Sequence, residues 1–145
     1  MTTVRLTRVV TFSAAHRYYR PEWSVARNRE VFGACANEHG HGHNYECHVT
    51  IVGPLDHETG MVMNLRDLDR LLREEISDHL DHRFLNHAVP EFGPGRQIPT
   101  SEEVAVYVWR RLEPRMPAGV TLVRVRIQED QFLAAEVGRD GSDAP

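Results

Sequence analysis

The sequence predicts an α+β protein in which two helices cover one face of a four-stranded antiparallel sheet, with the elements in the order ββααββ. Two segments rich in β-branched and aromatic residues open the chain, two segments with helical periodicity follow, and two further β-rich segments close it. Because the strands are grouped rather than alternating with helices, an antiparallel sheet is expected. The second face of such a sheet also needs a cover, which points to an oligomer.

The first half of the chain supplies two strands and one helix. "VRLTRVVTFSAAH" at 4–16 predicts the first strand, and "HNYECHVTIVG" at 43–53 predicts the second. Residues 17–40 between them are expected to form a long excursion with little regular structure, of the kind that is often functional. Asn64 is suited to cap a helix, with Asp67 at its third position. Its apolar stripe would consist of Leu65, Leu68, Leu72, Ile76 and His79.

The second half begins with a Pro- and Gly-rich segment at 84–99 that predicts a loop. Thr100 and Glu103 then form a capping box at the start of a second helix, which Pro114 ends. Its core face would consist of Val104, Val108 and Leu112. "VTLVRVRIQ" at 120–128 and "FLAAEV" at 132–137 predict the third and fourth strands. We therefore expect one domain at 1–138 and a disordered tail at 139–145.

Composition limits the functions that need to be considered. The chain has 145 residues, 41% of them hydrophobic and 26% charged, and its net charge of −4 gives no reason to expect nucleic-acid binding. No apolar run is long enough for a membrane helix. Two cysteines without an export signal predict a cytoplasmic protein with free thiols. All 17 basic residues are arginines, which excludes lysine Schiff-base chemistry.

The histidines of "CANEHGHGHNY" at 35–45 indicate a metal site. His41 and His43 would project from the same face of a strand, so both rings can reach one ion. His16 could supply a third ligand if the first two strands pair. Three ligands and an open position are typical of catalytic zinc. The alternative is a polar strand end that happens to contain histidines, and His39, which has the same parity, leaves the choice of ligands open.

The two thiols differ in their expected roles. Cys47 lies on the same strand face as the histidine pair, but roughly 13 Å beyond His43 at about 3.3 Å per residue, so core packing is its expected role. Cys35 precedes the strand, where the chain can fold back toward a metal. A nearby cation would favour its thiolate and its use as a base. A small buried side chain is the alternative for Cys35.

Several separated blocks give the sequence a resemblance to the 6-pyruvoyl-tetrahydropterin synthases and the related 6-carboxytetrahydropterin synthases, which share the tunnelling fold (T-fold). The blocks run in the same order along nearly the whole chain. They are "FSAAHR" at 12–17, "CANEHGHGHNY" at 35–45, "GMVMNLRDL" at 60–68, "LDHRFLN" at 80–86, "PTSEEVAVYVW" at 99–109 and "RVRIQE" at 124–129.

The resemblance implies a zinc-dependent lyase that eliminates triphosphate from 7,8-dihydroneopterin triphosphate in a homohexamer, a dimer of trimers with active sites between subunits. It implies Zn²⁺ as the only cofactor and a small pterin triphosphate as the partner. Implied roles fall on residues in three groups: the zinc ligands His16, His41 and His43; the catalytic residues Cys35, Asp81 and His82; and the substrate-binding residues Glu129, Thr100, Ser101 and Glu102.

Three functions remain open at this point. Cys35 lies six residues before His41, as in the pyruvoyl-forming enzymes, whereas the carboxy-forming enzymes of queuosine (7-deazaguanine) biosynthesis usually place this cysteine three residues before the pair. A pyruvoyl-type product is therefore favoured over a carboxy product. A non-catalytic T-fold protein that binds a pterin or purine is the third. Arg17, Arg20, Arg27 and Arg29 in the excursion would suit a triphosphate, with a solvated basic loop as the alternative.

Overall fold

The computed structural model describes residues 2–139, and its framework is a sheet with strand order β3-β1-β2-β4-β5. β1 (Thr3–His16) and β2 (His41–Pro54) form an unbroken antiparallel ladder that places His16 opposite His41. Apolar residues alternate with polar ones along both strands, as expected for a sheet with one buried face. The register of this ladder fixes the positions of all side chains near its end.

The sheet has five strands and is mixed, so the prediction of four antiparallel strands is wrong in this respect. β4 (Thr121–Gln128) pairs antiparallel with β2, and β5 (Ala134–Gly138) pairs antiparallel with β4. The fifth strand, β3 (Arg83–Phe84), runs parallel to β1 beside Ala14 and Ala15. With only two residues, β3 has no periodicity that a sequence could reveal.

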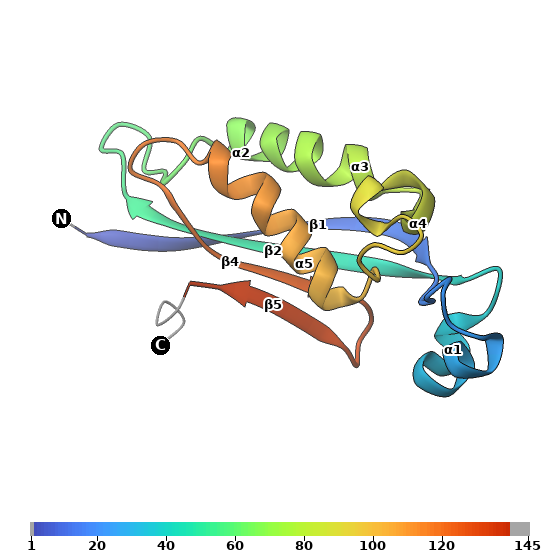
Figure 1. Ribbon diagram of the computed structural model, residues 1–145. Coiled ribbons are helices and arrows are strands. Elements are labelled where there is room, and N and C mark those ends of the chain that lie inside the picture. The colour runs from blue at the N-terminus through green and yellow to red at the C-terminus, as the bar shows by residue number, and fades with distance from the viewer. Residues whose placement is uncertain (1, 140–145) are drawn as a thin grey trace.

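Helices cover one face of this sheet (Figure 1). α2 (Leu65–Leu72) begins at the predicted cap Asn64, whose side chain accepts a hydrogen bond from Arg66 N–H, and continues through a π-helical turn (Arg73–Ser77) into α3 (Asp78–Leu80). The π turn inserts an extra residue and shifts the buried face. Leu80 is therefore buried, as Ile76 is, whereas His79, which was predicted to belong to the apolar stripe, is only half-buried.

α5 (Ser101–Leu112) agrees closely with the prediction. The Thr100 hydroxyl accepts a hydrogen bond from the Glu103 N–H, and a short 3₁₀ turn (Glu113–Arg115) follows the helix. Its predicted core residues are all buried: Val104, Val108 and Leu112.

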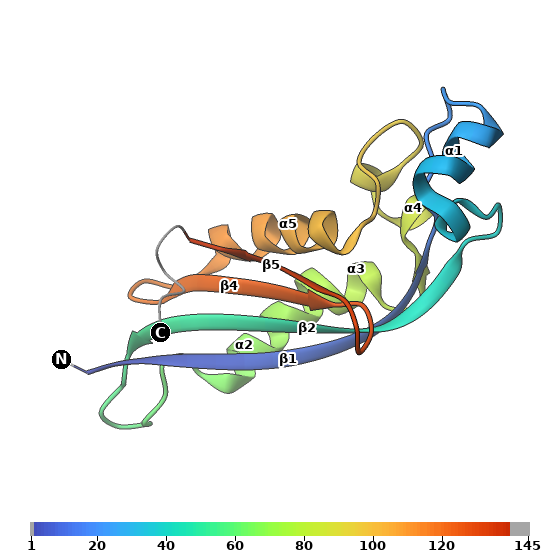
Figure 2. The ribbon, with the colours of Figure 1, turned by 90° about the horizontal axis from the view of Figure 1, so that it is seen from below.

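The excursion is not irregular, which corrects the prediction for 17–40. It contains α1 (Val25–Phe32), capped by the Ser24 hydroxyl, and a 3₁₀ turn (Gly33–Ala36). α1 projects beyond the end of β1 and β2 (Figures 1 and 2). The only buried residue of α1 is the polar Asn28, whose side-chain oxygen accepts a hydrogen bond from Arg20 N–H. A helix whose one buried residue is polar has no apolar stripe for a sequence to show.

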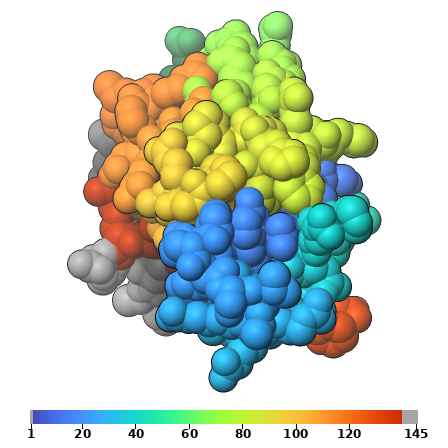
Figure 3. All heavy atoms as spheres, turned by 45° about the vertical axis from the view of Figure 1, so that its right-hand side comes forward, coloured from blue at the N-terminus to red at the C-terminus, as the bar shows by residue number. Residues whose placement is uncertain are grey.

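The predicted loop at 84–99 also contains a short helix, α4 (Leu85–Ala88), and a 3₁₀ turn (Pro90–Phe92). This segment lies beside the excursion on the face shown in Figure 3. Three hydrogen bonds join them. Arg17 N–H donates to the Asn86 side-chain oxygen at 2.8 Å, and the Asn86 side-chain N–H donates back to the Arg17 carbonyl at 2.8 Å. The Arg20 guanidinium donates to the Arg96 carbonyl at 2.8 Å.

The two sheet edges and the chain end complete the description. In the described residues, β5 and the part of β1 before Ala14 have no neighbouring strand on their outer sides. Arg139 donates to the Leu122 carbonyl and to Glu113, while 140–145 of the expected disordered tail lie outside the described residues. No helix between residues 2 and 139 is long and apolar enough to cross a bilayer.

Candidate metal centre and active site

Three histidines converge at the end of the β1–β2 ladder. His16 is the last residue of β1 and His41 the first of β2, and their Nε2 atoms are 3.1 Å apart. His43 lies two residues further along the same face. One ring nitrogen from each of the three lies within 4.8 Å of those of the others, and His39 is not part of this group. The pairing of the first two strands therefore brings together the three side chains named from the sequence.

Burial favours the neutral form of two of these imidazoles, His16 and His41. His16 is 0% exposed, and burial together with the neighbouring His41 and His43 lowers its pKa to about 3. Burial and His43 also lower the pKa of His41. Because metals bind the unprotonated ring nitrogen, these shifts favour metal binding at neutral pH.

Glu129 faces the cluster from the end of β4. Its side-chain Oε1 lies 3.6 Å from Nε2 of both His16 and His43. The residue is 8% exposed, and burial raises its pKa despite the opposing effect of His43. The family resemblance implied a substrate-binding role for Glu129, and in the structure this residue is buried.

The start of α5 lies beside this carboxylate. Ser101 is buried and Glu102 raises the pKa of Glu129 through its charge, so both predicted neighbours reach the same region. Thr100 uses its hydroxyl as the acceptor that caps the helix.

Two buried polar atoms indicate that the centre suits a cation. Within the described chain, His43 Nε2 and Glu129 Oε1 are buried and have no hydrogen-bond partner. A buried polar atom without a partner costs roughly 1–3 kcal/mol. A metal ion between the three ring nitrogens would give His43 Nε2 a partner, so the donor set fits a metal.

Cys35 lies near this centre. It belongs to the 3₁₀ turn after α1, and its carbonyl accepts a hydrogen bond from Tyr18 N–H at 2.8 Å. Burial and the charge of Glu129 raise the pKa of its thiol. The other thiol, Cys47, is fully buried as predicted, and burial raises its pKa to about 12.

Two tyrosines at the centre were missed by sequence reasoning. Tyr18 places its ring 4.8 Å from that of His16, and burial followed by the charges of Glu129 and Cys35 raises the pKa of its phenol. The Tyr45 hydroxyl lies 2.9 Å from His16 Nδ1. Tyr45 has the same strand parity as His41 and His43, so the alternation that found the histidines could have found it. Tyr18 left no comparable signal.

Asp81 and His82 do not join the histidine cluster within this protomer. They lie beside β1, where Asp81 accepts a hydrogen bond from Ser13 N–H and His82 N–H donates to the Ser13 carbonyl. The Ser13 bond and His82 lower the pKa of Asp81, whose carboxylate lies 3.0 Å from His82 Nδ1. The His82 side chain is 83% exposed, and its backbone φ of 58° is the only positive φ among the described non-glycine residues.

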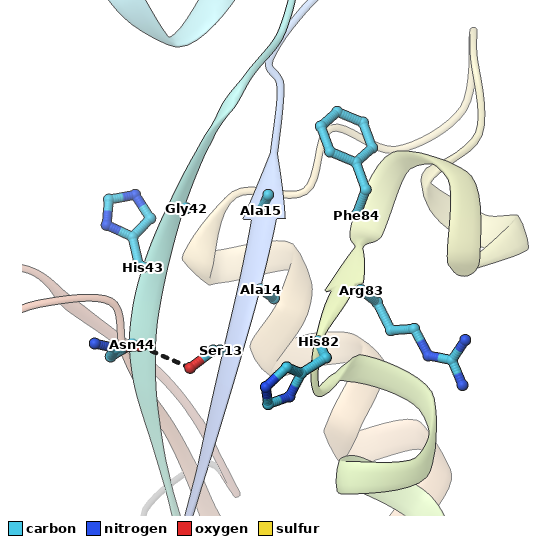
Figure 4. A pocket seen from close by; sticks show the side chains of 9 residues that line it. All are labelled: Ser13, Ala14, Ala15, Gly42, His43, Asn44, His82, Arg83 and Phe84. Atoms are coloured by element: carbon cyan, nitrogen blue, oxygen red, sulfur yellow. Dashed lines mark hydrogen bonds between the residues drawn. The ribbon is translucent and has the colours of Figure 1, made fainter.

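A hollow of about 440 Å³ separates the two groups (Figure 4). Its floor consists of small residues of β1 and β2, including Ala14, Ala15 and Gly42. In this view His43 and His82 lie on opposite sides of the β1–β2 pair. Joining His82 to the histidine cluster would therefore require a second subunit or a different arrangement of the chain.

The arginines of the excursion have separate surroundings. Arg17 stacks on Tyr19 and Arg27 stacks on Trp23, with the guanidinium carbons 4.1 and 4.0 Å from the ring centroids. Arg20 lines a hollow of about 480 Å³ together with Arg96. Of these three, Arg20 is the one that lines an open hollow together with another arginine, Arg96.

The fold and the three-histidine cluster define an α+β protein with a candidate catalytic metal centre at the end of a two-strand ladder. The chain belongs to the 6-pyruvoyl tetrahydropterin synthase family, whose sequence profile matches residues 5–140. It is 44% identical over 125 residues to proteins named 6-pyruvoyl tetrahydrobiopterin synthase from Pongo abelii and Homo sapiens, covering 86% of this chain and 84% of each relative.

A solved structure supports the same assignment. The 6-pyruvoyl tetrahydropterin synthase of Caenorhabditis elegans superimposes with a TM-score of 0.87 at 37% identity, covering 96% of this chain and 97% of that one. The α+β T-fold expected from the sequence is confirmed at this level.

Proposed function

We propose that this protein is a zinc-dependent 6-pyruvoyl-tetrahydropterin synthase that eliminates triphosphate from 7,8-dihydroneopterin triphosphate. The observation that carries the proposal is the convergence of His16, His41 and His43 beside the buried Glu129. Family membership and relatives with this name support it. The proposal includes a small-molecule pterin as the only substrate and a cytoplasmic location.

The three histidines would hold Zn²⁺, which when bound would polarise the hydroxyl oxygens of the substrate side chain as a Lewis acid. Glu129 would bind the pterin ring, because a carboxylate accepts two parallel N–H groups from such a ring. The buried Ser101 and the neighbouring Thr100 and Glu102 would complete that pocket. Cys35 would remove a carbon-bound proton from the substrate, and His82, oriented by Asp81, would move protons on the other side.

The separation of His82 from the histidines supports an oligomer with shared active sites. A neighbouring subunit would bring its Asp81 and His82 to the Cys35 side of this protomer. The two open edges of the sheet offer main-chain groups through which strands of neighbouring subunits can pair. A homohexamer made of two trimers is the assembly that we propose for this family member.

Mixing two inactive variants tests the shared site. Cys35→Ala and His82→Ala should each lower turnover by about 10²–10⁴-fold. If one site takes Cys35 and His82 from different subunits, hexamers reassembled from equal amounts should recover about a quarter of wild-type activity, because half the subunits retain Cys35 and half their neighbours retain His82. Mixed hexamers no more active than the parents would place both residues in one subunit and overturn the arrangement.

Product analysis tests the reaction itself. Mass spectrometry after incubation with 7,8-dihydroneopterin triphosphate should detect 6-pyruvoyl-tetrahydropterin and triphosphate in the zinc-loaded protein. A 6-carboxy product released with acetaldehyde would instead assign the protein to the queuosine-type reaction. Tight pterin binding with no turnover by the wild type would identify a non-catalytic binding protein.

One arginine is proposed to contact the triphosphate. Arg20 is favoured because it lines a hollow shared with Arg96 near the start of α5. Arg20→Ala should raise KM for the triphosphate substrate several-fold, whereas Arg27→Ala, whose guanidinium stacks on Trp23, should not. An unchanged KM in Arg20→Ala would show that Arg20 does not bind the triphosphate.

A further inference from the structure

We propose that Tyr45 is a positioning residue of the metal centre, whose hydroxyl holds the Nδ1 side of His16 so that Nε2 points at the metal. The inference rests on the proposed metal site and adds a residue outside its ligand set. It concerns how the site is pre-formed rather than the chemistry it supports.

The two ring nitrogens of His16 face different partners. Nε2 lies 3.1 Å from His41 Nε2 and 3.6 Å from Glu129 Oε1, so this nitrogen belongs to the converging set. Nδ1 lies 2.9 Å from the Tyr45 hydroxyl. When a neutral imidazole binds a cation through Nε2, its proton resides on Nδ1. The Tyr45 oxygen is placed to accept that proton's hydrogen bond, as outer hydrogen-bond partners do for histidine ligands in metal sites.

Tyr45 is held rigidly enough to fix the ring. It is 1% exposed, and its ring stacks on Phe12 with centroids 4.8 Å apart and planes inclined by 9°. Phe12 and Tyr45 are direct partners in the β1–β2 ladder. His16 lies on the same strand face as Phe12. The strand pairing, the ring stacking of Phe12 on Tyr45 and the hydrogen bond between Tyr45 and His16 are therefore close together. A phenol fixed in this way restricts His16 to a single orientation before any metal arrives.

The Tyr45 hydroxyl is buried and has His16 Nδ1 as its partner. A buried hydroxyl is costly unless it is hydrogen-bonded, and phenylalanine would fill the same volume without that cost. A main-chain group also lies beside the His16 ring: the carbonyl of Pro99, whose hydrogen bond favours protonation of the ring. Pro99 is therefore the competing acceptor for the Nδ1 proton, and the test must distinguish the two.

The first test measures metal affinity rather than turnover. Zinc is removed from wild type, Tyr45→Phe and the control Tyr107→Phe, and the dissociation constant for Zn²⁺ is measured by competition with a chromophoric chelator. Tyr107 is also a largely buried tyrosine, on α5, and its ring interacts with Arg111 rather than with a histidine. Tyr45→Phe should weaken zinc binding about 10–100-fold, and Tyr107→Phe should leave it within about twofold.

A purely structural role predicts a different pattern. In that case Tyr45→Phe changes the unfolding midpoint of the zinc-free protein, while the zinc dissociation constant stays within twofold of wild type, and the inference is overturned. Wild-type protein that binds no zinc would instead refute the proposed metal site. The Co²⁺-loaded forms give a second readout, because a reoriented His16 alters the d–d absorption bands in Tyr45→Phe but not in Tyr107→Phe.

A measurement on the wild type covers the case in which Tyr45→Phe fails to fold. Neutron diffraction from zinc-loaded crystals should show zinc on His16 Nε2 and a deuterium on Nδ1 directed at the Tyr45 oxygen. A deuterium directed only at the Pro99 carbonyl, or zinc on Nδ1, would refute the role of Tyr45.

Discussion

In the absence of metal, acid should destabilise this protein through His16. The folded state holds its pKa at about 3, against an ordinary value of 6.5, because the ring is buried beside two further imidazoles. The unfolded chain therefore binds a proton that the folded chain rejects, so stability is complete above pH 6.5 and is lost as the pH falls toward 3. At pH 5 the two pKa values correspond to a loss of about 2 kcal/mol from this one group.

The assay compares free energies of unfolding in urea at pH 7.5 and 5.0, with chelator present and protein concentration fixed. Wild type should lose about 2 kcal/mol more stability over this interval than His16→Asn, which has no proton to bind. His57→Asn removes an exposed histidine and should lose as much as wild type. If His16→Asn and wild type lose equal stability, the ring is not excluded from protonation and the reasoning about its burial is wrong.

Three further outcomes follow from the site. Burial and the charge of Glu129 raise the pKa of Cys35, so alkylation of this thiol in zinc-free protein should reach half its maximal rate above the ordinary thiol pKa. Zinc should shift that midpoint downward, as a pH series with iodoacetamide can measure. Glu129→Gln should raise the unfolding free energy of the zinc-free protein, because it removes a buried carboxylate. The same substitution should lower kcat/KM roughly 10–100-fold, because the pterin loses a charged hydrogen-bond acceptor. A Cβ at Gly40 would lie 2.6 Å from the His16 carbonyl oxygen, so Gly40→Ala should weaken zinc binding. Gly60 has a similar φ of 71° but open space around it, so Gly60→Ala should only lower the stability of the protein, by about 1–2 kcal/mol. Equal zinc affinities in the two variants would contradict this reasoning.

The main strands and α5 could be predicted because each buries a regular face. The Val104, Val108 and Leu112 spacing repeats with helical period, and the capping box marks the start of the helix. The predictions were wrong where the buried residues of a segment do not follow a regular helical or strand period. α1 buries only Asn28, and the π turn before α3 shifts the apolar phase by one residue. Neither a polar helix nor a local change of helical type is visible in a hydrophobic pattern.

The candidate site could be predicted in part for a similar reason. His41 and His43 share a strand face by alternation alone, but the choice of His16 as their companion depended on how two strands pair. His82 was named only through the family resemblance. His82 lies beside β1, where its N–H donates to the Ser13 carbonyl, and its φ is positive. Such a backbone conformation is uncommon in a residue other than glycine, and no local sequence pattern predicts it here.

The register of β1 against β2 links the core of this protein to its metal centre. If the pairing register shifted by one residue, His43 would turn to the opposite face of the sheet. Every buried side chain of β2 that lies on the same face as His43 would turn with it. Tyr45, Cys47, Val49 and Ile51 are each at most 1% exposed, and leaving such side chains in water costs roughly 1.5–3 kcal/mol for each large apolar one. The ladder has fourteen paired positions and no irregularity between β1 and β2. The free-energy cost of exposing these core side chains therefore fixes the strand register, and with it the backbone positions of the histidines, before any metal binds. What remains free is the rotation of each histidine ring, and at His16 the Tyr45 hydroxyl is placed to restrict it.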